Sequence, residues 1–330
     1  METLGLVILI LVALGFDFTN GFNDAANAIA MPISTRAMRP RVALALAAIF
    51  NLAGALVSTK VANTVGSIIT TPTSAAGLTV IFAAIVGAIL WNIIVWRFGL
   101  PSSSTHALIG GLCGAAIASS GHVNWHAVVQ KVVIPMVASP IVGFGLGFLL
   151  MLALLWAFRR ANPRNAAVGF RMGQWVSSAA MAFGHGLQDA QKTMGVITLA
   201  LVTTNHLNAF VVPIWVKVAC ACAISAGTAT GGNRIMRTLG RRVFKLDNTA
   251  AFAAQTVASS VLLTTAYVYA APVSTTHITT SAIMGVGSTR KFSAVRWGVA
   301  GNIVTAWLLT LPAAGLMAAG TFEVLHLFVK

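Results

Sequence analysis

Long, nearly uncharged apolar segments recur from one end of this chain to the other, and they restrict its fold more than any other feature. Each is long enough to cross the hydrocarbon core of a bilayer, about 30 Å thick, as an α-helix. With 57% of its 330 residues hydrophobic and only 8% charged, the chain cannot cover a water-facing surface. We therefore predict an all-α polytopic protein of the plasma (inner) membrane. The clearest segments are residues 42–59, 77–96, 132–158, 210–231 and 249–271.

The basic residues, which give a formal net charge of +15, lie in short segments between the apolar runs. The positive-inside bias places the four most basic segments, residues 36–41, 159–171, 234–245 and 290–296, in the cytoplasm. They show neither the single basic face nor the interleaved aromatic residues of a nucleic-acid-binding protein. The three cysteines have no metal-ligand spacing. We expect no nucleic-acid partner, no cofactor, and no metal beyond Na⁺.

Two motifs occur twice, in the same order, half a chain apart. Residues 21–27 are Gly-Phe-Asn-Asp-Ala-Ala-Asn, and residues 186–192, which begin 165 positions later, are Gly-Leu-Gln-Asp-Ala-Gln-Lys. Pro-Ser-Ser-Ser-Thr-His at 101–106 similarly corresponds to Pro-Val-Ser-Thr-Thr-His at 272–277. This order indicates an internal duplication.

The loop charges reverse between the two copies. The basic loop 36–41 corresponds to the uncharged loop 203–208, and the nearly neutral loop 60–74 corresponds to the basic loop 234–245. Corresponding loops therefore lie on opposite sides of the membrane, which requires an odd number of spans in each copy.

We expect residues 1–158 to form a first transmembrane repeat and residues 172–330 a second, inverted one, joined by a basic cytoplasmic linker at 159–171. Each repeat is predicted to have about five spans. The polar middles of residues 4–34 and 172–202 suggest broken helices, and re-entrant hairpins are the alternative for the Pro-Ser-Thr segments. Inverted repeats of this kind are a common plan of secondary transporters, with the binding site near the bilayer midplane.

Asp24 and Asp189 occupy the same place in the two copies, each inside an apolar segment of a chain with only six acidic residues. A carboxylate at the bilayer centre costs about 2.5–3.5 kcal/mol, so such residues usually bind or relay ions. Around Asp24 a polar stripe at helical spacing supplies oxygen ligands for a hard cation such as Na⁺. A helix-capping Asp or a hydrogen-bonded seam between helices is the structural alternative. The oxygen-bearing side chains near Asp24 are Asp17, Thr19, Asn20, Asn23 and Asn27.

The proline-led motifs are rich in hydroxyl groups, as at the start of a helix. Proline preorganises the first turn, and the hydroxyls and free N–H groups attract an anion. Ordinary capping of a membrane helix is the alternative explanation. The final residues, His106 and His277, fit a structural role as well as a ligand role. The first motif contributes Ser102, Ser103, Ser104 and Thr105, and the second contributes Ser274, Thr275 and Thr276.

All four motifs together resemble the inorganic phosphate transporter family, in both halves and in the right order. The resemblance implies cation-coupled phosphate uptake, with phosphate held between the Ser/Thr clusters and the pair Asp24 and Asp189. Some members of that family are sulfate permeases, so sulfate stays open as the substrate. The second copy departs from the family pattern, because Gln188 stands where an asparagine is usual. Its role as a cation ligand is therefore in doubt.

Two carboxylates and a divalent phosphate in one low-dielectric pocket repel each other, so cations must accompany the anion. Na⁺ or H⁺ would then be the coupling ion of a symporter working by alternating access. Lys192 aligns with Asn27, and we predict that it is a tethered counter-charge replacing one mobile cation. Snorkelling to the interface is the alternative.

Two other classes of protein compete with a coupled transporter. A membrane hydrolase built on Ser104 and His106 is disfavoured, because an enzyme has little need of two inverted copies of its site. A passive anion channel would conduct without a cation gradient. The sequence leaves open whether the protein forms a homodimer.

Overall fold

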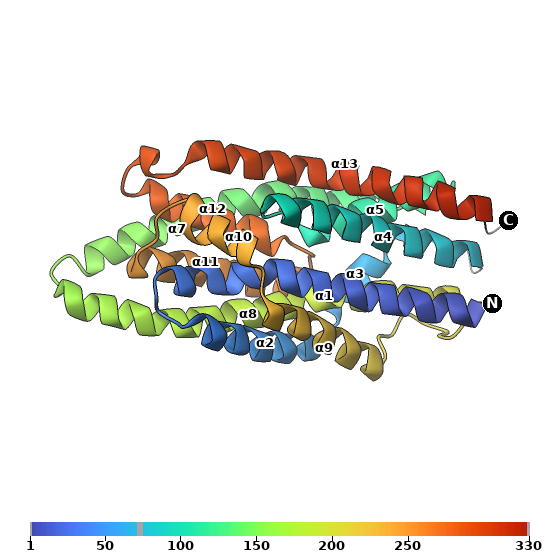
Figure 1. Ribbon diagram of the computed structural model, residues 1–330, viewed down its shortest axis with the longest axis horizontal. Helices are drawn as coiled ribbons and strands as arrows, with labels where there is room; N and C mark the ends of the chain where they lie inside the picture. Colours follow the sequence, from blue (N-terminus) through green and yellow to red (C-terminus); the bar gives the residue numbers. More distant parts are fainter. Residues whose placement is uncertain (1, 71–74, 329–330) are drawn as a thin grey trace.

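The computed structural model describes residues 2–70 and 75–328, and nearly all of its helices run along one long axis (Figure 1). The first half contains α1 (Glu2–Ser34), α2 (Pro40–Val57), α3 (Lys60–Gly66), α4 (Ala75–Phe98), α5 (Ser104–Ala118), α6 (Trp125–Val128) and α7 (Ile134–Ala157). The second half contains α8 (Pro163–Thr203), α9 (Ile214–Thr230), α10 (Asn233–Arg237), α11 (Asn248–Thr264), α12 (Thr275–Ser288) and α13 (Trp297–Phe328). Two short strands, β1 (Ile69–Thr70) and β2 (His122–Val123), pair antiparallel.

The predicted all-α polytopic architecture is confirmed. In the described part of the chain, six helices are long and apolar enough to cross a membrane: α1, α2, α4, the continuous α6–α7 helix, α11 and α13. Taking α9 and α10 as one bent span gives a seventh. The longest helix, α8, has 41 residues and extends about 60 Å. It is not among the six because its sequence is more polar, and its polar side chains from Gln174 to Thr193 are buried inside the bundle.

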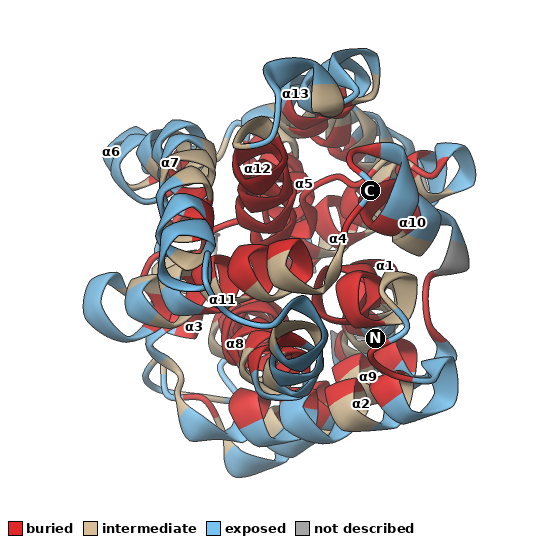
Figure 2. Cartoon of the chain, turned by 90° about the vertical axis from the view of Figure 1, so that its left-hand side faces the viewer, coloured by how far each residue is buried: buried red, intermediate tan, exposed pale blue. Residues whose placement is uncertain are grey.

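The distribution of apolar side chains is that of a protein surrounded by lipid. Figure 2 shows buried residues concentrated in the central helices α5, α8, α11 and α12, whereas α7 and α13 have exposed outer faces. Those outer faces carry large apolar side chains such as Ile141, Leu149, Leu308 and Leu316. A water-soluble protein rarely exposes apolar patches of this extent.

The basic segments gather at one end of the bundle, on the left of Figure 1, where the α1–α2, α7–α8 and α12–α13 connections lie. Residues 234–245 reach the same end, since the Arg296 N–H donates to the Val243 carbonyl. Arg290 pairs there with Asp247, the N-cap of α11. Helix α1 begins and α13 ends at the opposite end (Figure 1). The four segments that the charge bias places in the cytoplasm therefore share one side.

The Pro-Ser-Thr segments form the tips of two buried hairpins, α4–α5 and α11–α12. The tips meet each other, because the Thr105 hydroxyl donates to the Val273 carbonyl at 3.3 Å and the His106 and His277 rings lie 4.8 Å apart. With 15 and 14 residues, α5 and α12 are each about 22 Å long, too short to cross a hydrocarbon core of about 30 Å. The hairpin alternative therefore describes these segments. In contrast, α1 and α8 are continuous, so the expectation of broken helices fails there.

Each half packs its first two helices against the other half. A β-carbon on Gly21 of α1 would lie 2.1 Å from the Ile224 carbonyl oxygen of α9, and one on Gly186 of α8 would lie 2.1 Å from the Asn51 carbonyl oxygen of α2. Only glycine allows helices to approach this closely. A second equivalent pair of contacts joins Gly227 to Phe18 and Gly54 to Phe183.

These contacts join sequence-equivalent positions, and α1 and α8 run in opposite directions (Figure 1). The two halves are therefore interlocked and do not lie side by side as independent domains. The repeat boundaries, 1–158 and 172–330, stay a prediction.

Candidate functional site

The two hairpin tips meet α1 at one buried carboxylate, Asp24. The Ser104 hydroxyl of the first hairpin donates to Asp24 Oδ2 at 3.2 Å, and the Thr276 hydroxyl of the second hairpin donates to Oδ1 at 3.2 Å. Asp24 is only 5% exposed, so these hydroxyls replace the water that a carboxylate would otherwise bind. One side chain thus joins parts of the chain that are far apart in sequence.

Asp189 of α8 is the second carboxylate and is fully buried. Lys192 Nζ lies 2.9 Å from its Oδ1, while His185 Nε2 lies 3.1 Å and Asn20 Nδ2 3.2 Å from its Oδ2. His185 Nε2 is also 3.9 Å from Asp24 Oδ2, so the histidine stands between the two acids. The positive charge of Lys192 offsets the negative charge of the Asp189 carboxylate at short range.

Lys192 and Asn27 hold equivalent positions and make equivalent contacts. Lys192 Nζ donates to the hydroxyls of Ser104 at 3.1 Å and Thr105 at 2.8 Å, on the first hairpin. Asn27 Nδ2 donates to those of Thr275 at 3.2 Å and Thr276 at 3.0 Å, on the second hairpin. Each long helix thereby holds the hairpin of the opposite half. Lys192 is 1% exposed, which excludes snorkelling in this conformation.

Helices α5 and α12 both begin at this cluster, so their positive dipole ends converge on it. Ser103 and Ser274 are the N-caps, and each accepts the N–H of the histidine three residues later at 3.2 Å. The first two N–H groups of each helix have no acceptor within the helix. These N–H groups and the hydroxyls beside them are donors of the type that an anion requires, and anion binding at this place stays a prediction.

Some predicted residues lie away from the cluster. The Ser102 hydroxyl is 2.7 Å from that of Thr310. Gln188 Nε2 donates to the Leu262 carbonyl of α11 at 3.5 Å and to the Thr265 hydroxyl, directly after α11, at 3.1 Å. Gln188 therefore faces α11, not the carboxylates. Asn23 Oδ1 is buried with no hydrogen-bond partner among the described residues.

His185, at the centre of the cluster, was not assigned to it from the sequence, and Asn20 was expected only as an oxygen ligand near Asp24 and not as a partner of Asp189. Each stands four residues before the aspartate of its own motif, and the two are themselves 165 positions apart. Extending the alignment of the repeats by one helical turn would have found them. His185 is oriented by Asn51, whose Oδ1 lies 3.0 Å from its Nδ1.

Asp24, His185 and Asp189 could hold a cation, because one ligand atom from each lies within 4.8 Å of the others. All three are buried. The carboxylate oxygens suit Na⁺, and His185 Nε2 offers a position for a proton. Na⁺ and a proton would therefore find ligands in the same place.

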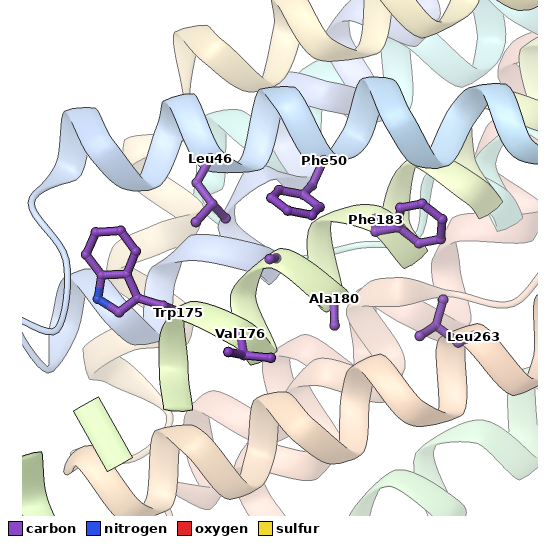
Figure 3. Close-up of a pocket in the computed structure, with 8 residues that line it drawn as sticks. Leu46, Phe50, Trp175, Val176, Ala180, Phe183 and Leu263 are labelled. Atoms are coloured by element: carbon purple, nitrogen blue, oxygen red, sulfur yellow. The ribbon is translucent and has the colours of Figure 1, made fainter. Parts of the chain in front are cut away.

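An apolar groove between α2, α8 and α11 has different chemistry (Figure 3). It lies on the outer surface, where Val176 and Trp175 are exposed, and Phe50 and Leu263 also line it. These side chains offer a phosphate ion neither positive charge nor a cluster of hydroxyls. An exposed apolar surface of this kind suits contact with lipid.

Comparison with known proteins decides the family. The sequence profile of the phosphate transporter family matches residues 20–170 and, a second time, residues 159–318. The chain belongs to this family. Among its family relatives, a probable low-affinity inorganic phosphate transporter of Rhizobium meliloti is 48% identical over 318 residues, 95% of this chain and 94% of the relative. One of Bacillus subtilis with the same description is 40% identical over 325 residues, 97% of both chains. The resemblance inferred from the four motifs is thus confirmed.

A solved structure of a sodium-dependent phosphate transporter has the same fold as this family member. It superposes with a TM-score of 0.86, covering 98% of this chain and 100% of that one, at 23% sequence identity. Together with the helices long enough to span a bilayer, this establishes a multi-pass membrane protein.

Proposed function

We propose that this chain is a symporter that carries inorganic phosphate across the plasma membrane with Na⁺ or H⁺, by alternating access. One observation carries the proposal: both hairpin tips, each with a helix N-terminus and hydroxyl groups, meet at the buried pair Asp24 and Asp189. Family membership and the descriptions of the relatives support phosphate as the substrate.

Phosphate would bind to the hydroxyls that now bond to the site's own residues. Ser104, Thr105, Thr275 and Thr276 would exchange these internal partners for phosphate oxygens, and the free N–H groups at the starts of α5 and α12 would complete the shell. Asp24 would accept a hydrogen bond from the P–OH group of HPO₄²⁻, which keeps its proton. Sulfate has no such proton at neutral pH, so a carboxylate only repels it unless a cation intervenes.

Cation coupling follows from the charges of the site. The two carboxylates, Asp24 and Asp189, are accompanied among the described residues by only one lysine ammonium, that of Lys192 beside Asp189, so an arriving anion needs further positive charge. Na⁺ would bind the carboxylates, with Asn23 and Asn27 as added ligands, or a proton would occupy His185. Gln188, which faces α11, would enter the shell only after rotating.

Alternating access would use the interlocked halves. Each hairpin tip is held by the long helix of the other half, so releasing one set of contacts opens the site toward one side. The equivalent set would open the other side. This behaviour matches transporters built from inverted repeats.

Uptake of radiolabelled phosphate into proteoliposomes tests the function. We expect accumulation driven by an imposed Na⁺ or proton gradient, and little inhibition by an equal concentration of sulfate. Asp24→Asn should abolish accumulation, while the surface variant Asp247→Asn should keep it. Flux that persists without any cation gradient would instead identify a passive channel, and full competition by sulfate would identify a sulfate permease.

A further inference from the structure

Asp17 is a third carboxylate inside the bundle, and the phosphate site does not use it. It is 0% exposed, and neither of its oxygens has a hydrogen-bond partner among the described residues. It lies on α1 seven residues before Asp24, so it is on the same helix face, about 10 Å nearer the end where α1 begins. An ionised carboxyl in such surroundings is very costly unless a positive charge joins it.

Two further oxygen atoms without partners accompany Asp17. The Thr193 hydroxyl of α8 faces the Asp17 carboxylate but makes no hydrogen bond of good geometry with it. Asn20, one turn along α1, uses its Nδ2 for Asp189 and leaves its buried Oδ1 unpartnered. Because α8 runs antiparallel to α1, Thr193 is displaced from Asp189 in the same direction as Asp17 is from Asp24 (Figure 1).

The charged groups within range of Asp17 are already paired. Lys192 and His185 both contact Asp189, at 2.9 Å and 3.1 Å. The negative charge of Asp17 is thus left without a fixed partner in this part of the protein.

The internal duplication shows that packing does not require these polar groups. At the offset of 165 residues, Asp17 corresponds to Ala182 and Thr193 corresponds to Ala28. Ala28 and Ala182 are both buried in one apolar cluster. The same pair of helices therefore packs with two alanines at the equivalent place, and the Asp–Thr pair needs another explanation.

We propose that Asp17, Thr193 and Asn20 Oδ1 form a monovalent-cation site that takes Na⁺, separate from the Asp24–Asp189 cluster. A proton would need one acceptor, and a protonated Asp17 would donate a hydrogen bond to a neighbouring oxygen, yet Asp17 makes no hydrogen bond of good geometry with the described residues. Oxygen ligands held about 2.4 Å from a central cation do not hydrogen-bond to one another. The oxygens of Asp17, Thr193 and Asn20 likewise make no such bonds of good geometry with the described residues. One carboxylate with two neutral oxygens supplies a single negative charge, which suits a monovalent ion. The site deepens the proposed function, on which its role in coupling rests, by adding a second ion position on one side of the phosphate cluster.

The test measures Na⁺ binding to purified protein without phosphate, using ²²Na⁺ and Na⁺-dependent thermal stabilisation. Asp17→Asn should weaken Na⁺ binding by at least about tenfold, and Thr193→Ala should weaken it less. The double variant Asp17→Ala, Thr193→Ala reproduces the Ala182–Ala28 pair. It should fold, lose the part of the Na⁺-dependent shift in Tm that Asp24→Asn keeps, and have a higher Tm than the wild type in Na⁺-free buffer, because an unpaired buried carboxylate is gone.

Three results would overturn the site. These are equal Na⁺ binding by wild type and Asp17→Asn, stabilisation by acid in place of Na⁺, and an unchanged Na⁺ affinity in Thr193→Ala.

Asp24→Asn separates the two proposals, because it should abolish phosphate uptake and keep the Na⁺ binding that depends on Asp17. If the wild type carried no phosphate but bound Na⁺ through Asp17, the proposed function would fail and this site would stand. Proton-driven phosphate uptake with no Na⁺ binding would overturn this site and leave the proposed function standing.

Discussion

Lys192→Asn should change the coupling stoichiometry, because it gives the second half the residue that the first half has at Asn27. The substitution removes an ammonium that contacts Asp189 at 2.9 Å and the hydroxyls of Ser104 and Thr105 at 3.1 and 2.8 Å. The pair of carboxylates then has no fixed positive charge from a lysine. A mobile cation then has to supply the positive charge that the lysine ammonium supplied.

The size of the effect follows from these distances. A phosphate oxygen bonded to the Ser104 or Thr105 hydroxyl would lie about 5.5 Å from the ammonium, where a unit charge pair is worth about 3 kcal/mol at an effective dielectric constant of about 20. Losing it should weaken phosphate binding about a hundredfold at low cation concentration. Saturating cation should restore most of the affinity, because an additional ion then occupies the vacated position.

The assay is the ratio of cation flux to phosphate flux in proteoliposomes, taken from the reversal potential or from ²²Na⁺ and ³²P uptake. We expect one more cation per phosphate in Lys192→Asn than in the wild type. Lys131→Asn is the matched control, since Lys131 is exposed and its ammonium bonds, among the described residues, only to the Tyr269 carbonyl, at 3.4 Å. If active Lys192→Asn protein transports with the wild-type ratio, Lys192 is not a substitute cation. Lys192→Gln provides the same measurement should the asparagine variant fail to fold.

Further predictions concern packing and the hairpins. Gly186→Ala places a methyl group 2.1 Å from the Asn51 carbonyl oxygen and should destabilise the protein by about 1–3 kcal/mol or more, whereas Gly169→Ala on the same helix meets nothing within 4 Å. A thermal melt in detergent compares the two, and equal Tm values would contradict the close approach of α2 and α8. Thr276→Val removes the bonds to Asp24 and Asn27 and should weaken phosphate binding about tenfold, at roughly 1–1.5 kcal/mol per hydrogen bond. Thr289→Val, which loses only a bond to the Val286 carbonyl, should bind as the wild type does. Equal phosphate affinities in these two variants would show that Thr276 does not bind phosphate.

Much of the architecture could be predicted because it depends on local composition. Uncharged runs identify helices that cross a membrane, and loop charges sort their ends, since the bilayer acts on each segment separately. The duplication was visible because Asp24 and Asp189 keep their neighbours at a constant offset. The basic segments lie at one end of the bundle, as that charge pattern predicts.

The sequence left other features undecided. Polar residues in the middle of α1 and α8 suggested broken helices, but both are continuous because their polar side chains find partners on the hairpin tips. Gln188 and Ser102 stand next to site residues in sequence but face other helices. Helical periodicity predicts which side chains share a face of a helix, but it does not predict which other helix that face contacts.

The sequence by itself determined that this chain lies in a membrane, contains two copies of one unit, and places Asp24 and Asp189 at equivalent positions. Only the tertiary structure decided that each copy holds the hairpin of the other, and that Asn20 and His185 join the two acids. It also revealed Asp17 and Thr193 facing each other where the equivalent pair is Ala182 and Ala28. The physical reason is that hydropathy and charge act on each segment alone, whereas a buried polar group is stable only beside partners that distant segments supply.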